Sequence, residues 1–250
     1  MGEEKKLVSV VIPAFNEEQT ITGVVGVCLK TPEVGEIIVV NDASQDKTGE
    51  KLQIFKDKIK VINLPKNGGK GYAVAQGVKT ARYDYLLFLD ADLINLQSHH
   101  LSSLVWPVLN NQAEMTIAVL VSFYSPYYRS WPLSGQRCLK KSSFNNRIIK
   151  KMEKTGYGLE VFLNELMKKK RVAVIPWVSD KPLHLKKISK QQNWVKTYAK
   201  ETFEVFRQTI ASQRSSYQEK MKVGFLRGLA VYLKVSYKRL KDYLLEDFEE

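Results

Sequence analysis

Cysteine and histidine are both scarce in this chain of 250 residues, which has two cysteines and three histidines. The cysteines, Cys28 and Cys138, are far apart in the sequence and neither belongs to a C-x-x-C motif. This spacing argues against a disulfide framework, a zinc knuckle and a redox pair. We therefore expect both cysteines to be reduced thiols.

Long apolar stretches are also missing. The longest segments without a charged residue are 93–113, which polar residues and a proline interrupt, and 115–128, which is too short to cross a bilayer core of about 30 Å. The chain begins with MGEEKK and then has an apolar run only over 7–13, which is unlike a signal peptide. We expect a cytoplasmic protein without a transmembrane helix, with peripheral membrane contact as an open alternative.

Charge is distributed very unevenly along the chain. The composition is that of a globular protein, 44% hydrophobic and 26% charged, with a net charge of +13. Residues 1–135 have a net charge of −1, whereas residues 136–250 have a net charge of +14. The basic second half suits anionic lipid, a phosphate-bearing acceptor or nucleic acid.

Apolar runs rich in β-branched residues alternate with helical stretches over the first 120 residues. Because each run is apolar throughout, the pattern predicts an α/β fold with a mostly parallel sheet and helices on both faces. Ligands bind beyond the carboxyl ends of the strands in such sheets. The predicted strands are 7–13, 36–41, 60–64, 83–89, 116–123 and 171–178, and the predicted helices include 17–29, 70–81, 156–168, 191–213 and 221–248.

The sharpest chemical signal follows the fourth predicted strand, where Asp90 and Asp92 flank Ala91. Two carboxylates at the mouth of an apolar sheet repel each other and lose solvation unless a cation lies between them. Mg²⁺ or Mn²⁺ binds one or two carboxylates and completes its shell with water and phosphate oxygens. The alternative is a pair of solvated loop aspartates that cap the next helix.

Glycine and lysine at the start of the predicted helix 70–81 indicate a phosphate site. Lys70 follows two glycines, so its ammonium and nearby backbone N–H groups can reach a phosphate. The same segment partly mimics the dinucleotide fingerprint G-x-G-x-x-A, but that motif should follow the first strand, where PAFNEE stands instead. The glycine-rich loop of a sugar nucleotidyltransferase is also absent there.

Four segments, taken in order, resemble the family 2 glycosyltransferases of GT-A fold: VSVVIPAFNEE, EIIVVNDASQDKT, NGGKGYAVAQGV and DYLLFLDADL. The resemblance is strong over 7–93 and weak elsewhere. It implies that the loop after the first strand holds nucleobase and ribose, that Asp42 contacts the base, and that Asp92 binds the metal and takes part in catalysis. The residues that the resemblance assigns to the nucleotide sugar are Pro13, Ala14, Asn16, Glu17, Asp42, Gly69, Lys70, Asp90 and Ala91.

Two later segments, SGQR at 134–137 and GYGLE at 156–160, are loosely similar to acceptor-side segments of single-domain family 2 enzymes such as glucosyl-3-phosphoglycerate synthases. Glu160 could accept the proton of an acceptor hydroxyl, or it could simply be an acid in the first turn of a helix. His184 could be a third metal ligand or a surface histidine. His99 and His100 are expected at a helix start.

We expect a GT-A-like catalytic domain over 1–185, with a nucleotide-sugar half at 7–93 and an acceptor half at 94–185, followed by a helical extension over 186–250. The predicted reaction is metal-dependent transfer of a hexose from a nucleotide sugar to a hydroxyl or phosphate acceptor, with Mg²⁺ or Mn²⁺. The alternatives are a polyprenyl-phosphate sugar transferase at the membrane surface and a non-catalytic nucleic-acid-binding or scaffolding protein. The intact Asp90 and Asp92 argue against the last, so nucleic acid is not an expected partner.

The basic runs of the second half admit several interpretations, namely a solvated face, a site for an acceptor phosphate and a contact with an anionic bilayer. The apolar stripe of the helix predicted at 221–248 is expected to pack on its own domain rather than on lipid. The basic residues concerned are Lys140, Lys141, Arg147, Lys150, Lys151, Lys154 and the run 168–171.

Overall fold

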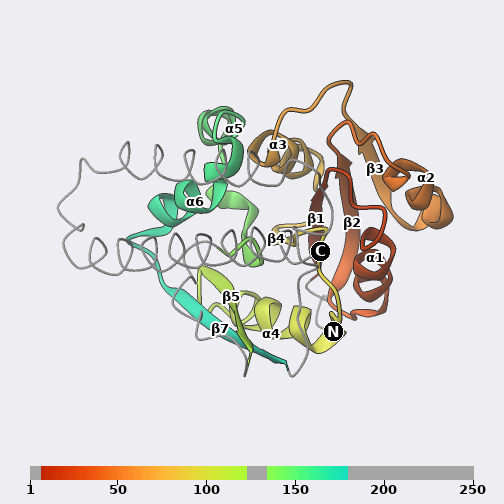
Figure 1. The fold of residues 1–250 in the computed structure, drawn as a ribbon. Coiled ribbons are helices and arrows are strands. Elements are labelled where there is room, and N and C mark those ends of the chain that lie inside the picture. The colour runs from red at the N-terminus through yellow and green to blue at the C-terminus, as the bar shows by residue number, and fades with distance from the viewer. Residues whose placement is uncertain (1–6, 123–133, 180–250) are drawn as a thin grey trace, which may run out of the picture. The chain divides into compact units, whose positions relative to one another are not determined.

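The computed structural model describes residues 7–122 and 134–179 (Figure 1). His184, the helices predicted at 191–213 and 221–248, and the domain boundary predicted at residue 185 lie outside the described residues. Within the described part, no helix has the length and apolar character needed to span a bilayer.

A seven-stranded sheet forms the centre of the described fold, in the order β3-β2-β1-β4-β6-β5-β7. β1 pairs in parallel with β2 and β4, β2 with β3, and β5 with β7, while β6 runs antiparallel between β4 and β5. The mostly parallel sheet predicted from the sequence is confirmed, and the antiparallel β6 is new. The strands are β1 Val8–Ala14, β2 Val34–Asn41, β3 Lys60–Asn63, β4 Tyr85–Phe88, β5 Met115–Ser122, β6 Arg137–Lys140 and β7 Val172–Ser179.

Helices cover both faces of the sheet, as predicted (Figure 1). Along β1, Val10 and Ile12 pack against α1, α2 and α4, whereas Val11 points to the opposite face and packs against α3, α5 and α6. Side chains alternate between the faces of a strand, so one continuous apolar run supplies both cores. The α-helices are α1 Ile21–Lys30, α2 Thr48–Leu52, α3 Lys70–Thr80, α4 Ser98–Leu109, α5 Asn146–Met152 and α6 Leu159–Met167, and 3-10 turns span Gln53–Lys58, Lys141–Ser143 and Gly156–Gly158.

The first helix begins later than predicted. The sequence pattern places Asn16 just before the helix and residues 17 and 18 in its first turn, but α1 starts at Ile21. Asn16 has a φ of 56°, in the left-handed region that breaks a right-handed helix. Its side-chain oxygen instead accepts a hydrogen bond from the backbone N–H of Gln45, at 2.8 Å. Residues 16–20 therefore form a loop that is available to a ligand.

The predicted position of His99 and His100 at a helix start is confirmed, because α4 begins at Ser98. His100 is buried, its Nδ1 accepts from the backbone N–H of Gln97 at 3.1 Å, and its ring lies 5.1 Å from that of Trp177. Burial, assisted by His99, lowers the pKa of His100 to about 4. His100 is thus a neutral residue of the core.

Candidate active site

Hydrogen bonds tie the loop after β1 to the loop after β2. The backbone N–H of Asn16 donates to Ser44 Oγ at 3.0 Å, and that of Glu17 donates to Thr48 Oγ1 at 2.7 Å. The two loops also exchange the bond between Gln45 and Asn16 described above. The residues predicted to hold nucleobase and ribose therefore lie on one connected rim, next to the carboxyl ends of two parallel strands.

Asp42 is buried directly after β2, and its carboxylate anchors the glycine turn before α3. The backbone N–H groups of Gly68 and Gly69 donate to its two oxygens, at 2.7 and 2.9 Å. Gly69 has a φ of 84°, a conformation that glycine adopts without strain. The contact with a base predicted for Asp42 stays a prediction, and the structure adds a second role that the sequence did not indicate.

Lys70 is the first residue of α3, and its ammonium lies between two carboxylates. The distance from Nζ is 2.6 Å to Asp90 Oδ1 and 2.6 Å to Glu160 Oε1. Burial lowers the pKa of Lys70, but these two carboxylates more than offset that effect, so its pKa lies above the ordinary value for lysine. Lys70, which the sequence assigns to the nucleotide half, thus contacts Asp90 of the DxD pair and Glu160, the predicted general base.

The two aspartates of the DxD turn differ in their exposure to solvent. Asp90 Oδ2 accepts a hydrogen bond from Gln136 Nε2 at 2.8 Å, and the side chain of Asp92 is 5% exposed, next to the buried Ala91. Among the described residues, no three His, Cys, Asp or Glu side chains gather around one metal position. Two carboxylates alone fit a hard divalent cation that takes its remaining ligands from water and substrate phosphate oxygens.

Arg137 is a buried cation that the sequence did not single out. Its Nε donates to the carbonyl of Ser134 and its Nη1 to Asn164 Oδ1, both at 2.7 Å. Burial lowers the pKa of Arg137 to about 10, although Glu160 and Asp90 oppose the shift. Arg137 therefore links β6, the turn before it and α6, and with Lys70 it balances the two carboxylates.

Two glycines allow the acceptor-side segments to approach Lys70 closely. A methyl carbon on Gly71 would collide with Thr155 Oγ1 and would lie 2.6 Å from the carbonyl oxygen of Met152. A methyl carbon on Gly135 would lie 2.5 Å from both carboxylate oxygens of Asp90. Real carbon atoms almost never come so near, so the backbone at both positions depends on the absence of a side chain.

Glu160 lies in the first turn of a helix, as one interpretation of the sequence expects, and its role as a general base stays a prediction. It lies in the first turn of α6, where a carboxylate favours the helix dipole, and it also contacts Lys70 inside the site. It is 7% exposed. The structure thus brings Lys70, Asp90 and Glu160 together, while of the two histidines of α4 His100 belongs to the core and His99 is exposed.

A family comparison agrees with this geometry, because residues 9–175 match the model of Glycosyl transferase family 2. The chain belongs to glycosyl transferase family 2. Over 98 residues it is 41% identical to a dolichyl-phosphate beta-glucosyltransferase of Drosophila melanogaster. This match covers 34% of this chain and 30% of that protein. Over 91 residues it is 36% identical to a poly-beta-1,6-N-acetyl-D-glucosamine synthase of Staphylococcus epidermidis, 35% of this chain and 22% of that one. The chain therefore spans less than a third of the length of these curated relatives.

Solved structures share the fold of this family 2 glycosyltransferase. A glucosyl-3-phosphoglycerate synthase from Mycobacterium tuberculosis, in complex with Mn²⁺, UDP and glucosyl-3-phosphoglycerate, superposes with a TM-score of 0.64 at 20% identity, covering 83% of this chain and 80% of that one. The same enzyme with Mg²⁺ and UDP gives a TM-score of 0.63 at 20% identity, over 83% and 79% of the two chains. The GT-A-like fold predicted from the sequence is confirmed.

Proposed function

We propose that this family 2 glycosyltransferase moves a hexose from a nucleotide sugar to a hydroxyl or phosphate acceptor, and that Mg²⁺ or Mn²⁺ assists the transfer. One observation carries the proposal: a single ammonium, that of Lys70, contacts both the DxD carboxylate Asp90 and the acceptor-side carboxylate Glu160, each at 2.6 Å. Transfer between two substrates requires that donor-binding and acceptor-binding residues lie close together. Here the ammonium of Lys70 joins one residue of each kind.

The metal would be held by Asp92 and Asp90. When bound, it would supply positive charge to the diphosphate leaving group as the glycosidic bond breaks. Lys70 is placed to donate hydrogen bonds to phosphate oxygens, which are the strong, charge-assisted kind. Gln136 orients one oxygen of Asp90, so the carboxylate keeps its position when Lys70 changes partner.

Glu160 is the proposed general base. It is buried, lies in the first turn of α6 and contacts the ammonium of Lys70. Once the ammonium turns to a phosphate, the carboxylate is available to accept the proton of the acceptor hydroxyl. Such assistance increases the rate about 10² to 10⁴-fold.

We infer that the donor is a UDP-sugar and that the acceptor carries a phosphate. The solved neighbours bind UDP with Mn²⁺ or Mg²⁺, and one of these complexes also contains phosphoglyceric acid, while the fly relative is named for dolichyl phosphate. A phosphorylated small molecule and a polyprenyl phosphate share the same recognition chemistry. The lipid-linked acceptor would place the protein at the surface of an anionic membrane, in the cytoplasm.

A thermal-shift screen tests the donor part of the proposal. UDP-, GDP- and dTDP-sugars are compared with and without Mn²⁺, because a ligand that binds only the native state raises its stability. At a hundredfold excess over Kd, UDP with Mn²⁺ should add about 2.7 kcal/mol, which is about 5 to 10 °C in Tm for a chain of this size.

The variant Asp92→Ala should lose the Mn²⁺-dependent part of this shift. Asp84→Ala is the matched control, since Asp84 is an exposed aspartate just before β4 and on the far side from the site. The proposal fails if no nucleotide raises the Tm of the parent chain. Transfer assays with 3-phosphoglycerate and with a polyprenyl phosphate then separate the two acceptor classes.

A further inference from the structure

α5 presents its basic side chains on one face. Arg147, Lys150, Lys151 and Lys154 are spaced i, i+3, i+4 and i+7, which places them on one side of a helix and of the turn that follows it. All four are exposed, whereas the opposite face of α5 contributes buried apolar side chains to the core below α3. We call these four residues, with Asn146, the α5 basic face.

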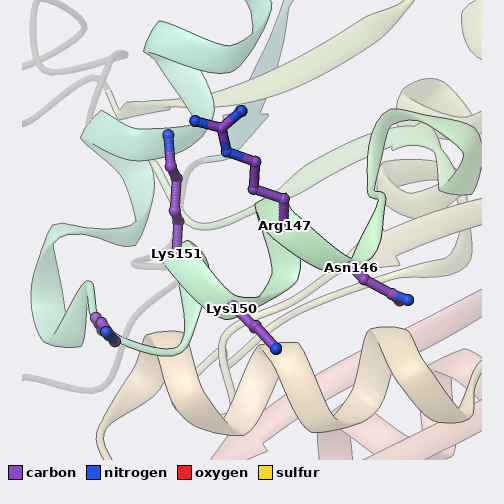
Figure 2. A pocket seen from close by; sticks show the side chains of 5 residues that line it. Asn146, Arg147, Lys150 and Lys151 are labelled. Carbon is purple, nitrogen blue, oxygen red and sulfur yellow. The ribbon is translucent and has the colours of Figure 1, made fainter.

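The α5 basic face surrounds a hollow of about 400 Å³, which these five residues line among those that the structure describes. In the view of Figure 2 the side chains spread apart from this face, because those of Arg147 and Lys151 extend one way and that of Lys150 the other. The cations are therefore spread over a surface rather than focused on one point.

Within the described part of the chain, no salt bridge joins a carboxylate to the four cations of this face. Lys150 contributes to the lowered pKa of Glu153, but the hydrogen bonds of Glu153 go to Lys79 Nζ at 2.5 Å and to Gln76 Nε2 at 3.2 Å. Other basic residues of the second half do have acidic partners, such as Lys168 with Glu165 at 3.0 Å. Like charges at these helical spacings destabilise a helix slightly, and an anionic partner removes that repulsion.

The position of the face connects it with the site. The chain leaves α5, forms the turn at Thr155 and Gly156 that packs on Gly71, and reaches Glu160 within six residues of Lys154. α5 also packs beside α3, the helix that begins with Lys70. A surface that holds α5 thus lies next to the acceptor side of the site.

We propose that the α5 basic face docks the protein on an anionic phospholipid surface. Lysine ammoniums are compact point charges that suit a fluid array of phosphate headgroups, whereas one tightly bound phosphate favours the planar fork of arginine. Single-stranded nucleic acid also needs aromatic platforms for its bases, and none of the five lining residues is aromatic. The docking itself does not depend on the proposed function. Only its purpose does, which is to present a lipid-linked phosphate to Glu160.

Vesicle co-sedimentation of the full chain tests the proposal, with phosphatidylcholine vesicles and with vesicles that also contain phosphatidylglycerol. Each basic residue near an anionic surface is worth about a fivefold change in binding, so the variant K150Q/K151Q/K154Q should bind about 100-fold more weakly at low salt. The control K51Q/K58Q/K60Q removes the same charge from exposed lysines near the β3 edge of the sheet and should bind like the parent. Parent binding should fall steeply at 1 M salt, where the Debye length is about 3 Å.

The proposal is overturned if the parent ignores anionic vesicles, if the α5 variant binds them like the parent, or if both variants lose binding equally. It is also overturned if the α5 variant loses only the binding of a dT20 oligonucleotide, since the face would then serve nucleic acid. UDP and Mn²⁺ binding, measured on the same samples, shows that each variant is folded. It also separates failure of the docking surface from failure of the proposed function, because nucleotide binding needs no vesicle.

Discussion

Replacing Lys70 by methionine should destabilise the fold far more than an ordinary lost ion pair. The substitution keeps the length of the side chain but removes two charge-assisted hydrogen bonds of 2.6 Å, and it leaves Asp90 and Glu160 without their shared cation. The three side chains are only 21%, 22% and 10% exposed. Removal of one partner from a largely buried set costs about 3 to 5 kcal/mol, which lowers Tm by about 6 to 20 °C at this chain length.

The same helix offers a matched control. Lys79 pairs with Glu153 at 2.5 Å, but its side chain is 46% exposed, so Lys79→Met should cost about 1 kcal/mol or less. Both variants and the parent are unfolded by heat and by urea at pH 8 and at pH 5.

The contribution of Lys70 to the stability of the parent chain depends on pH. The pKa of Lys70 is raised above its ordinary value, so the stability that it contributes is complete below about pH 10 and is lost only as the pH rises through the folded-state pKa. Between pH 5 and 8 the ammonium of the parent stays charged. Equal losses of stability for the two variants would refute the view that Lys70 holds the site together.

Four further predictions follow from the same contacts. Asp42→Ala should weaken UDP binding without metal by about 1.5 to 3 kcal/mol, and unchanged affinity in calorimetry would remove Asp42 from the nucleotide site. Glu160→Gln should lower turnover about 10² to 10⁴-fold with little change in donor affinity, whereas retained turnover would make it a purely structural residue. Arg137→Met should cost about 3 to 5 kcal/mol in urea unfolding, against about 1 kcal/mol or less for the exposed Arg82→Met; similar losses would contradict the role of Arg137 as a buried link. The pKa of His100 is lowered to about 4 in the folded chain, so between pH 6.5 and 4 the unfolded chain binds a proton that the folded chain does not. The free energy of unfolding should therefore fall by about 3 kcal/mol from pH 6.5 to 4, and His100→Gln should reduce this pH dependence.

The nucleotide half could be predicted because its strands are encoded locally. β1 and β2 are continuous apolar runs that end in polar segments, and each strand supplies both cores of a covered sheet. β6 and α5 could not be predicted in this way. β6 has four residues with a cation at each end, and α5 has seven, so their stability comes from pairing with β4 and β5 and from packing rather than from their own sequence.

The members of the candidate site were predicted singly, but their partnerships were not. Lys70 and Glu160 are 90 residues apart, and their contact depends on the approach of the Thr155 turn to Gly71. Nothing in the segment SGQR shows that Gln136 turns to Asp90 while Arg137 turns into the core. The one local signal for Arg137 is a cation at the start of an otherwise apolar strand, which is rare without a buried partner.

The two sides of the site differ in how much they must change when substrates arrive, and this implies an order of binding. On the rim around Asn16 and Asp42, the loops are already fixed by their own hydrogen bonds, so a nucleotide that docks there loses little affinity to the ordering of the chain. On the other side, Glu160 is occupied by Lys70 until the ammonium finds a new anion. The diphosphate of the donor is such an anion, so donor binding would release Glu160, the general base that we propose, and an acceptor that arrived first would meet a site without a free base. Kinetics with two substrates should therefore be sequential and ordered, with the nucleotide sugar first and the free nucleoside diphosphate as a competitive inhibitor against the donor alone.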